Sequence, residues 1–203
     1  MEENMELRAF EVQADEAEEG VIEGYAVVYG QMTTIGGMFR EVVEPGAVTQ
    51  ESLKDVPFFI NHNDRMIPVA RYQSGRAVNS LELSLDSKGL RFRTKLDLDN
   101  NAEARSLYSG IKRGDITGMS FAFKIDAQRW ENMASPMPTR RIQKYKEIRD
   151  ISSVVRPAYR GAKVEARAEP ATAEQVLEEA RRKAAQSCDL ALLKDKIRMK
   201  GKV

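Results

Sequence analysis

The sequence predicts a mainly β domain with flanking helices, an α+β fold, followed by a helical tail. Apolar and polar residues alternate in most segments before about residue 165, which is the periodicity of half-buried strands. Beyond Arg167, β-branched and aromatic residues become rare, and alanine, glutamate, lysine and arginine dominate. We therefore expect one domain over residues 1–166 and a separate tail over residues 167–203.

The first half of the domain is expected to be mostly strands. Strands are predicted where charged and apolar residues alternate, or where β-branched and aromatic residues cluster. Gly30 closes one such segment, and Pro45-Gly46 turns the chain before a short helix. The expected elements are strands at 6–12, 21–29, 39–43 and 57–61 and a short helix at 47–54.

The second half of the domain continues in the same way. Leu81, Leu83 and Leu85 alternate with polar residues, and residues 86–89 read as a hairpin loop. The only tryptophan, two prolines and several polar residues predict a mobile loop at 128–139. The expected strands are 69–72, 78–85, 90–96, 116–125, 140–151 and 153–155.

Two capping boxes predict the longer helices. Asn100 with Glu103 begins a helix over 100–113 that Gly114 ends, and Thr172 with Gln175 begins the tail helix. Apolar residues recur at helical spacing in both helices. They are Leu107, Tyr108 and Ile111 in the first helix and Val176, Leu177, Ala180, Ala184 and Cys188 in the second.

Composition excludes several classes of function. The net charge is +1, from 32 basic and 31 acidic residues, which argues against a nucleic-acid partner. A single cysteine and a single histidine build neither an internal disulfide nor a zinc site, so we expect no metal, no cofactor and a reducing compartment. No apolar run approaches the ~20 residues of a membrane helix, and the acidic N-terminus is not a secretory signal. We expect a soluble, cytosolic protein with no membrane partner.

Three residues could carry chemistry together. His62, the only histidine, follows the apolar run at 57–61, and imidazole exchanges protons near neutral pH. Ser120 follows Gly118 at the start of an expected strand, and Asp150 could orient the imidazole, with Glu147 as a rival. Each residue alone is more often structural: a half-buried histidine, an ordinary strand serine, a surface carboxylate paired with arginine.

The order His62, Ser120, Asp150 and the segments around these residues resemble the prohead protease family of tailed phages. The resemblance covers most of residues 20–165, with departures at Val48, Asn63, Ala122 and Asp150, where the family usually has Phe, an acid, Gly and Glu. The similar segments are Gly24-Tyr25-Ala26-Val27-Val28-Tyr29, Phe39-Arg40-Glu41 with Glu44-Pro45-Gly46-Ala47, Phe59-Ile60-Asn61-His62-Asn63, Ile67-Pro68-Val69-Ala70-Arg71, Gly89-Leu90-Arg91-Phe92, Gly118-Met119-Ser120-Phe121-Ala122-Phe123, and Asp150-Ile151-Ser152-Ser153-Val154 with Pro157-Ala158-Tyr159.

The resemblance implies a small, mostly antiparallel β-barrel flanked by helices, similar to the herpesvirus assembly proteases. It implies a serine endopeptidase in which Ser120 is the nucleophile, His62 the general base and Asp150 the third member. Because aspartate is one methylene shorter than the usual glutamate, Glu147 stays an alternative. Backbone amides near Met119, Ser120 and Arg156 are the expected oxyanion donors, and no metal is required.

The implied substrates are the scaffold, or the scaffold-like arm of the major capsid protein, and the protease itself, inside the prohead in the host cytoplasm. Self-association is also implied. The small-residue junction at 165–173 is a candidate self-cleavage site, and the basic amphipathic tail could dock on scaffold or capsid-protein helices. The alternative is a non-catalytic scaffolding or structural module, or a protease–scaffold fusion; a small peptide-binding β-barrel is a further rival.

Overall fold

The computed structural model describes residues 6–15, 18–155 and 173–186. Ten strands, a 3-10 turn and two helices lie within these ranges. In chain order they are β1 (Glu6–Ala14), β2 (Val21–Val28), β3 (Thr33–Ile35), β4 (Phe39–Val43), η1 (Gln50–Ser52), β5 (Asp55–Ile60), β6 (Ala70–Gln73), β7 (Leu81–Leu85), β8 (Gly89–Lys95), α1 (Ala102–Lys112), β9 (Gly118–Glu131), β10 (Thr139–Val154) and a helix at 173–186. The predicted mainly β, α+β class is confirmed.

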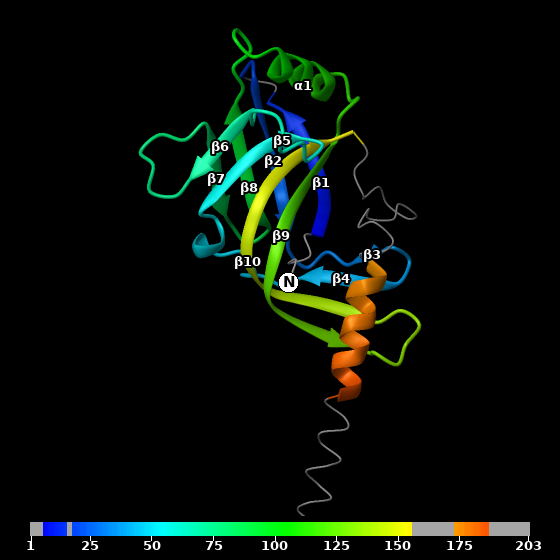
Figure 1. The fold of residues 1–203 in the computed structure, drawn as a ribbon. Coiled ribbons are helices and arrows are strands. Elements are labelled where there is room, and N and C mark those ends of the chain that lie inside the picture. The colour runs from blue at the N-terminus through cyan, green and yellow to red at the C-terminus, as the bar shows by residue number, and fades with distance from the viewer. Residues whose placement is uncertain (1–5, 16–17, 156–172, 187–203) are drawn as a thin grey trace, which may run out of the picture.

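The strands form one strongly curved sheet, as Figure 1 shows. Its main path runs β3-β4-β10-β9-β1-β2-β8-β7, and β5 joins it by pairing with β10 and β6. The edge of β10 that faces away from β9 is shared, because β4 pairs with its first residues and β5 with its last. Both of these pairings are parallel, whereas the other strand pairs are antiparallel.

The expected small, mostly antiparallel β-barrel is confirmed only in part, because the described strands do not form a closed ring. The opening lies between β6 and β7, where side-chain oxygens, and not backbone carbonyls of β7, accept hydrogen bonds from the β6 amides. The amide of Arg71 donates to Ser80 Oγ at 2.9 Å, and the amide of Gln73 donates to Asn79 Oδ1 at 2.8 Å. The outward donors of β6 are therefore occupied before β7 can pair with them.

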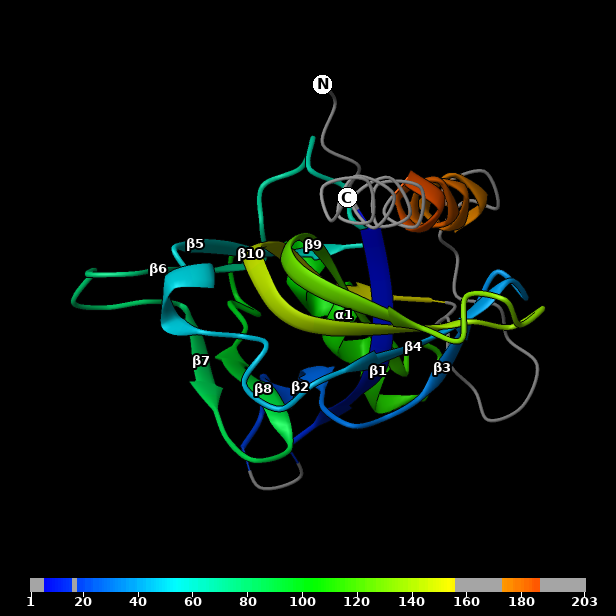
Figure 2. The same cartoon turned by 90° about the horizontal axis from the view of Figure 1, so that it is seen from below.

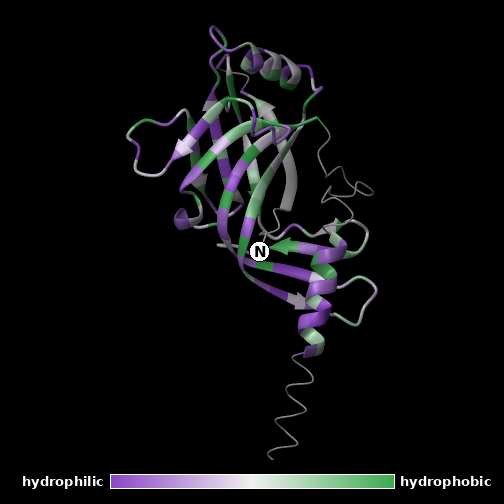
Figure 3. Cartoon of the chain, viewed as in Figure 1, coloured by the Kyte–Doolittle hydropathy of each residue, from purple (hydrophilic) through white to green (hydrophobic). Residues whose placement is uncertain are grey.

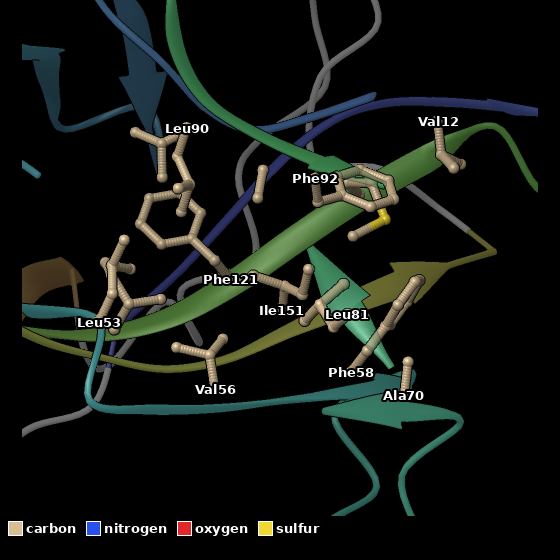
Figure 4. Packing of buried hydrophobic residues seen from close by; sticks show 14 of the residues in the cluster. Val12, Leu53, Val56, Phe58, Ala70, Leu81, Leu90, Phe92, Phe121 and Ile151 are labelled. Carbon is tan, nitrogen blue, oxygen red and sulfur yellow. The ribbon is translucent and has the colours of Figure 1, made fainter. Parts of the chain in front are cut away.

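The core lies inside the curve of the sheet, and α1 covers one end of it (Figure 1). Figure 4 shows Phe121 from β9 and Ile151 from β10 among core side chains that include Phe58, Leu81 and Phe92. All five are fully buried, and each such side chain stabilises the fold by about 1.5–3 kcal/mol. The core therefore fixes which face of β9 and β10 points inward.

The helix α1 begins one residue later than expected. Asn101, not Asn100, is its N-cap, and the Asn101 side chain accepts hydrogen bonds from the amides of Glu103 and Ala104. The expected apolar stripe is confirmed, since its three members are buried against the sheet: Leu107, Tyr108 and Ile111. The helix expected at 47–54 is only the 3-10 turn η1.

The hairpin of β7 and β8 is confirmed, with the loop at 86–89 closed by the Asp86 side chain. Asp86 Oδ1 accepts hydrogen bonds from the amides of Lys88 and Gly89. Gly89 has a φ of 157°, and a Cβ there would overlap the carbonyl oxygen of Val27. Only glycine fits this position, the first residue of the segment 89–92.

The hairpin of β9 and β10 is much longer than expected. The loop predicted at 128–139 is wrong at its start, because β9 extends to Glu131, and β10 runs to Val154 without a break at residue 152. Trp130 packs edge-on against Phe39 of β4, with ring centroids 5.1 Å apart, and Arg140 lies over the same indole. These contacts are tertiary, so the local sequence could not indicate them.

The helix at 173–186 packs on the outer side of the layer formed by β9 and β10 (Figure 2). The strands β2 and β8 lie on the other side of this layer. Ala173 and Leu177 are buried with Ile35 and Phe39 in a second, small apolar cluster. Figure 3 shows the rest of this helix as mostly hydrophilic, as expected for an amphipathic tail. The predicted cap Thr172, almost all of the candidate junction at 165–173, and Cys188 lie outside the described residues.

None of the described helices is long and apolar enough to cross a membrane.

Candidate active site

The candidate site is built on three neighbouring strands, β5, β10 and β9. Ser152 of β10 lies opposite Phe59 of β5 on one side and opposite Ser120 of β9 on the other. A register shift between Ile148 and Asp150 marks a β-bulge just before the site. Such bulges bend a strand and re-aim the following side chain, here that of Asp150.

The structure brings His62 and Asp150 into direct contact. His62 Nδ1 and Asp150 Oδ1 are 2.6 Å apart, and the two side chains are only 14% and 12% exposed. An ionised carboxylate only accepts hydrogen bonds, so the Nδ1 hydrogen of the imidazole points at Asp150. In a neutral ring with this tautomer Nε2 is an acceptor, and Nε2 is buried without a hydrogen-bond partner among the described residues.

The histidine reaches this position through an unusual turn. β5 ends at Ile60, and Asn61 and His62 both adopt left-handed backbone conformations, with φ of 52° and 55°. The amide of Asn61 donates to the carbonyl of Ser153 at 2.9 Å, and Asn61 Oδ1 accepts from the amide of Val155 at 3.3 Å. Left-handed non-glycine residues persist where neighbouring groups hold them, and here β10 does so.

Ser120 lies on the same face of the sheet as Asp150 and Ser152. Residues directly opposite each other on paired strands point to the same face, and Ser120 is opposite Ser152. The neighbouring Met119 and Phe121 point the other way, into the core. Ser120 keeps 5% of its surface exposed.

The structure thus places Ser120 one strand away from the His62–Asp150 pair without joining it to the ring. No hydrogen bond links Ser120 Oγ to His62 Nε2, since Nε2 has no partner among residues 6–15, 18–155 and 173–186. Opposed Cβ atoms on paired strands are about 5 Å apart, so Ser120 lies close to Ser152, whose Oγ is 3.2 Å from the His62 amide nitrogen.

The rival carboxylate Glu147 lies elsewhere. It is opposite Lys124 on β9, and its carboxylate is 3.7 Å from the Lys124 ammonium group. Its side chain is 47% exposed. Of the two acids considered from the sequence, Asp150 is therefore the one in contact with His62.

A comparison with known families decides the class of this protein. The sequence model of the family described as caudovirus prohead serine protease matches residues 6–178 of the 203-residue chain. The chain belongs to this family. It is thus a prohead protease, a hydrolase of the serine protease class with a role in phage capsid maturation. Neither a search of curated proteins nor a search of solved structures found a match.

Two of the three expected oxyanion donors of this prohead protease, Met119 and Ser120, can be located in the fold. Met119 and Ser120 lie where β9 is paired on both sides, with β1 and with β10. Amides in a strand paired on both sides point at neighbouring strands, so these two amides are not directed at a substrate. Arg156 lies outside the described residues.

One residue of the site was missed from the sequence. Ser152 is fully buried, donates a hydrogen bond to Asp150 Oδ1 at 3.0 Å and accepts one from the His62 amide at 3.2 Å. The signal was a second polar residue two positions after Asp150, because such spacing in a strand puts both side chains on one face. Within the described residues, no cluster of three or more His, Cys, Asp or Glu side chains forms a metal site.

Proposed function

We propose that this prohead protease is a serine endopeptidase in which Ser120 is the nucleophile, His62 the general base and Asp150 the residue that orients the base. The observation that carries the proposal is the His62–Asp150 hydrogen bond, which leaves a buried Nε2, unpartnered among the described residues, on the side of the ring away from the carboxylate. Ser120 lies one strand away, on the same face of the sheet.

The chemistry follows from these roles. His62 Nε2 takes the Ser120 proton as Oγ attacks a peptide carbonyl carbon, and Asp150 stabilises the imidazolium that forms. The imidazolium then protonates the leaving amine, so the peptide bond breaks and an acyl-serine remains. A water molecule, activated by the same imidazole, hydrolyses this ester and restores Ser120.

We further propose that the substrates are the scaffold or the scaffold-like arm of the major capsid protein, and the chain itself, cut inside the prohead in the host cytoplasm. Family membership supports capsid-related protein substrates. Self-cleavage at the small-residue junction 165–173 and self-association remain proposals that rest on the sequence and on the family.

Co-expression with the capsid protein of the same phage tests the function. We expect shortened capsid-protein bands with the native chain and none with Ser120→Ala. The matched control is Ser153→Ala, which removes another buried strand serine, one whose Oγ lies 3.5 Å from Met119 Sδ and away from His62. Cleavage that survives Ser120→Ala would remove the mechanism, and no cleavage by the native chain would favour a scaffolding module.

A further inference from the structure

Ser152 connects the two residues that must stay aligned for the proposed chemistry. It is fully buried, and its hydroxyl joins the Asp150 carboxylate to the His62 backbone. The direction of both bonds is fixed, because a carboxylate only accepts and an amide N–H only donates. The single hydroxyl hydrogen therefore points at Asp150 Oδ1, and an oxygen lone pair receives the His62 amide.

The Ser152 hydroxyl contributes to the hydrogen bonding of both residues that it joins, Asp150 and His62. Asp150 Oδ1 already receives the Nδ1 hydrogen of His62, so Ser152 supplies its second donor. His62 sits in a left-handed turn, with φ of 55°, and its amide finds its acceptor in the Ser152 side chain. A left-handed non-glycine residue relaxes to ordinary backbone angles unless its surroundings hold it.

The same contacts argue against Ser152 as a competing nucleophile. Its hydroxyl hydrogen is committed to Asp150, on the Nδ1 side of the imidazole, whereas the ring nitrogen that no described residue contacts through a hydrogen bond is Nε2. Ser152 is also completely shielded, whereas Ser120 keeps 5% exposure.

We propose that Ser152 is a positioning residue, which locks the Asp150 carboxylate and the His62 turn in one arrangement so that Nε2 faces Ser120. This inference rests on the proposed function, because positioning matters only if His62 acts as the base. Without the hydroxyl, Asp150 Oδ1 loses one of the two donors that the described residues supply, and the His62 amide loses its acceptor.

Kinetics of Ser152→Ala, Ser152→Thr and Ser153→Ala test the proposal. We expect Ser152→Ala to lower kcat on the order of 10- to 100-fold, the range seen when outer hydrogen-bond partners of metal-ligating side chains are removed. KM should stay unchanged, because Ser152 is too buried to touch substrate. Ser152→Thr keeps the hydroxyl and should restore most of kcat, while Ser153→Ala, the buried neighbour, should match the native chain.

A spectroscopic measurement separates this proposal from the proposed function. His62 is the only histidine, so ¹⁵N-histidine labelling reports on this ring alone. In the native chain we expect an Nδ1–H proton resonance protected from exchange, and in Ser152→Ala a loss of that protection, with Ser153→Ala unchanged. This readout works even in a chain that cleaves nothing.

Equal kcat for Ser152→Ala and the native chain, or an unchanged Nδ1–H resonance in Ser152→Ala, would overturn the positioning role. A fall in kcat that Ser152→Thr does not rescue, while Nδ1–H stays protected, would also overturn it and indicate a packing defect. A native chain without peptidase activity but with a Ser152-dependent resonance would overturn the proposed function and leave the positioning of His62 intact.

Discussion

The two ends of the β9–β10 hairpin both bury polar side chains, but they do so differently. Near the turn, Arg140 and Glu41 are 3% and 2% exposed and form an ion pair of 3.1 Å, with Gln128 accepting a further hydrogen bond from Arg140 Nε. At the other end, His62 and Asp150 are paired, yet the second ring nitrogen of the histidine has no hydrogen-bond partner in the part of the chain that the structure describes. Buried polarity alone therefore does not distinguish the two ends; what differs is a buried ring nitrogen that no described residue contacts through a hydrogen bond.

The largest expected effect is at the site end, in His62→Gln. Glutamine keeps a polar side chain but cannot accept and return a proton, so the cleavage rate of purified capsid-protein precursor should fall roughly 10⁴- to 10⁶-fold. Urea unfolding should show a stability change far smaller than this loss. A variant that keeps more than a small fraction of native activity would mean that the base is another residue.

The next largest effect is expected at Asp150 and distinguishes it from Glu147, the other candidate acid of β10. Asp150→Asn should lower kcat on the order of 10³- to 10⁴-fold, because an amide can hold the wrong imidazole tautomer. The control is Glu147→Gln, which removes an exposed carboxylate paired with Lys124 and should leave kcat unchanged. The reverse ranking of the two variants would make Glu147 the third member of the triad.

At the turn end, Arg140→Met should change stability and not chemistry. The substitution leaves Glu41 buried beside a neutral side chain, and breaking such pairs costs about 3–5 kcal/mol of unfolding free energy. Urea unfolding followed by circular dichroism measures this, and kcat per folded molecule should stay unchanged. Adding Glu41→Leu should recover much of the loss, since neither charge is then buried.

The control for this pair is Arg129→Met, on the same hairpin. Arg129 is 58% exposed and pairs with Glu131, so its loss should cost less than about 1 kcal/mol. If Arg140→Met were as mild as Arg129→Met, the buried pair would not hold the turn end together.

The smallest effect is expected from Asp55→Asn, on the strand that carries His62. The hydrogen bond from Arg71 lowers the pKa of Asp55 below its ordinary value, and burial opposes this. A lowered folded-state pKa gives stability that is present above the ordinary value of 3.8 and is lost as the pH falls through the folded value. Both side chains are more than 40% exposed, so the loss at neutral pH should be below about 1 kcal/mol.

Unfolding midpoints of Asp55→Asn and the native chain, measured from neutral to acid pH, check this. The difference should shrink as the pH falls and also at high salt. A stability difference that grows as the pH falls would mean that folding does not lower the pKa of Asp55. An effect on kcat would mean that the surface pair, and not only β10, positions His62.

The sequence predicted the strand pattern well because the alternation of residues is local. It also predicted that His62, Ser120 and Asp150 lie on strands or at their ends, and that Asp150, ahead of Glu147, orients the base. The contact of Asp150 with His62 agrees with that order. The strand positions needed only residue types and spacing, whereas the order of Asp150 ahead of Glu147 came from the resemblance to the prohead protease family.

What could not be predicted depends on contacts between distant segments. The bulge before Asp150 exists only in the pairing of β10 with β9, so the direction of that carboxylate is invisible in the chain itself. The extension of β9 through Trp130 depends on Phe39, which lies some ninety residues earlier. The role of Ser152 depends on a turn that follows another strand.

The most direct test of the account is covalent labelling with a fluorophosphonate, followed by mass spectrometry of the peptides. The reagent forms a stable ester only with a serine whose hydroxyl a nearby base activates. We predict modification at Ser120 in the native chain, and none at that residue in His62→Gln. Modification at Ser152, or labelling of Ser120 that persists undiminished without His62, would contradict the arrangement proposed for this site.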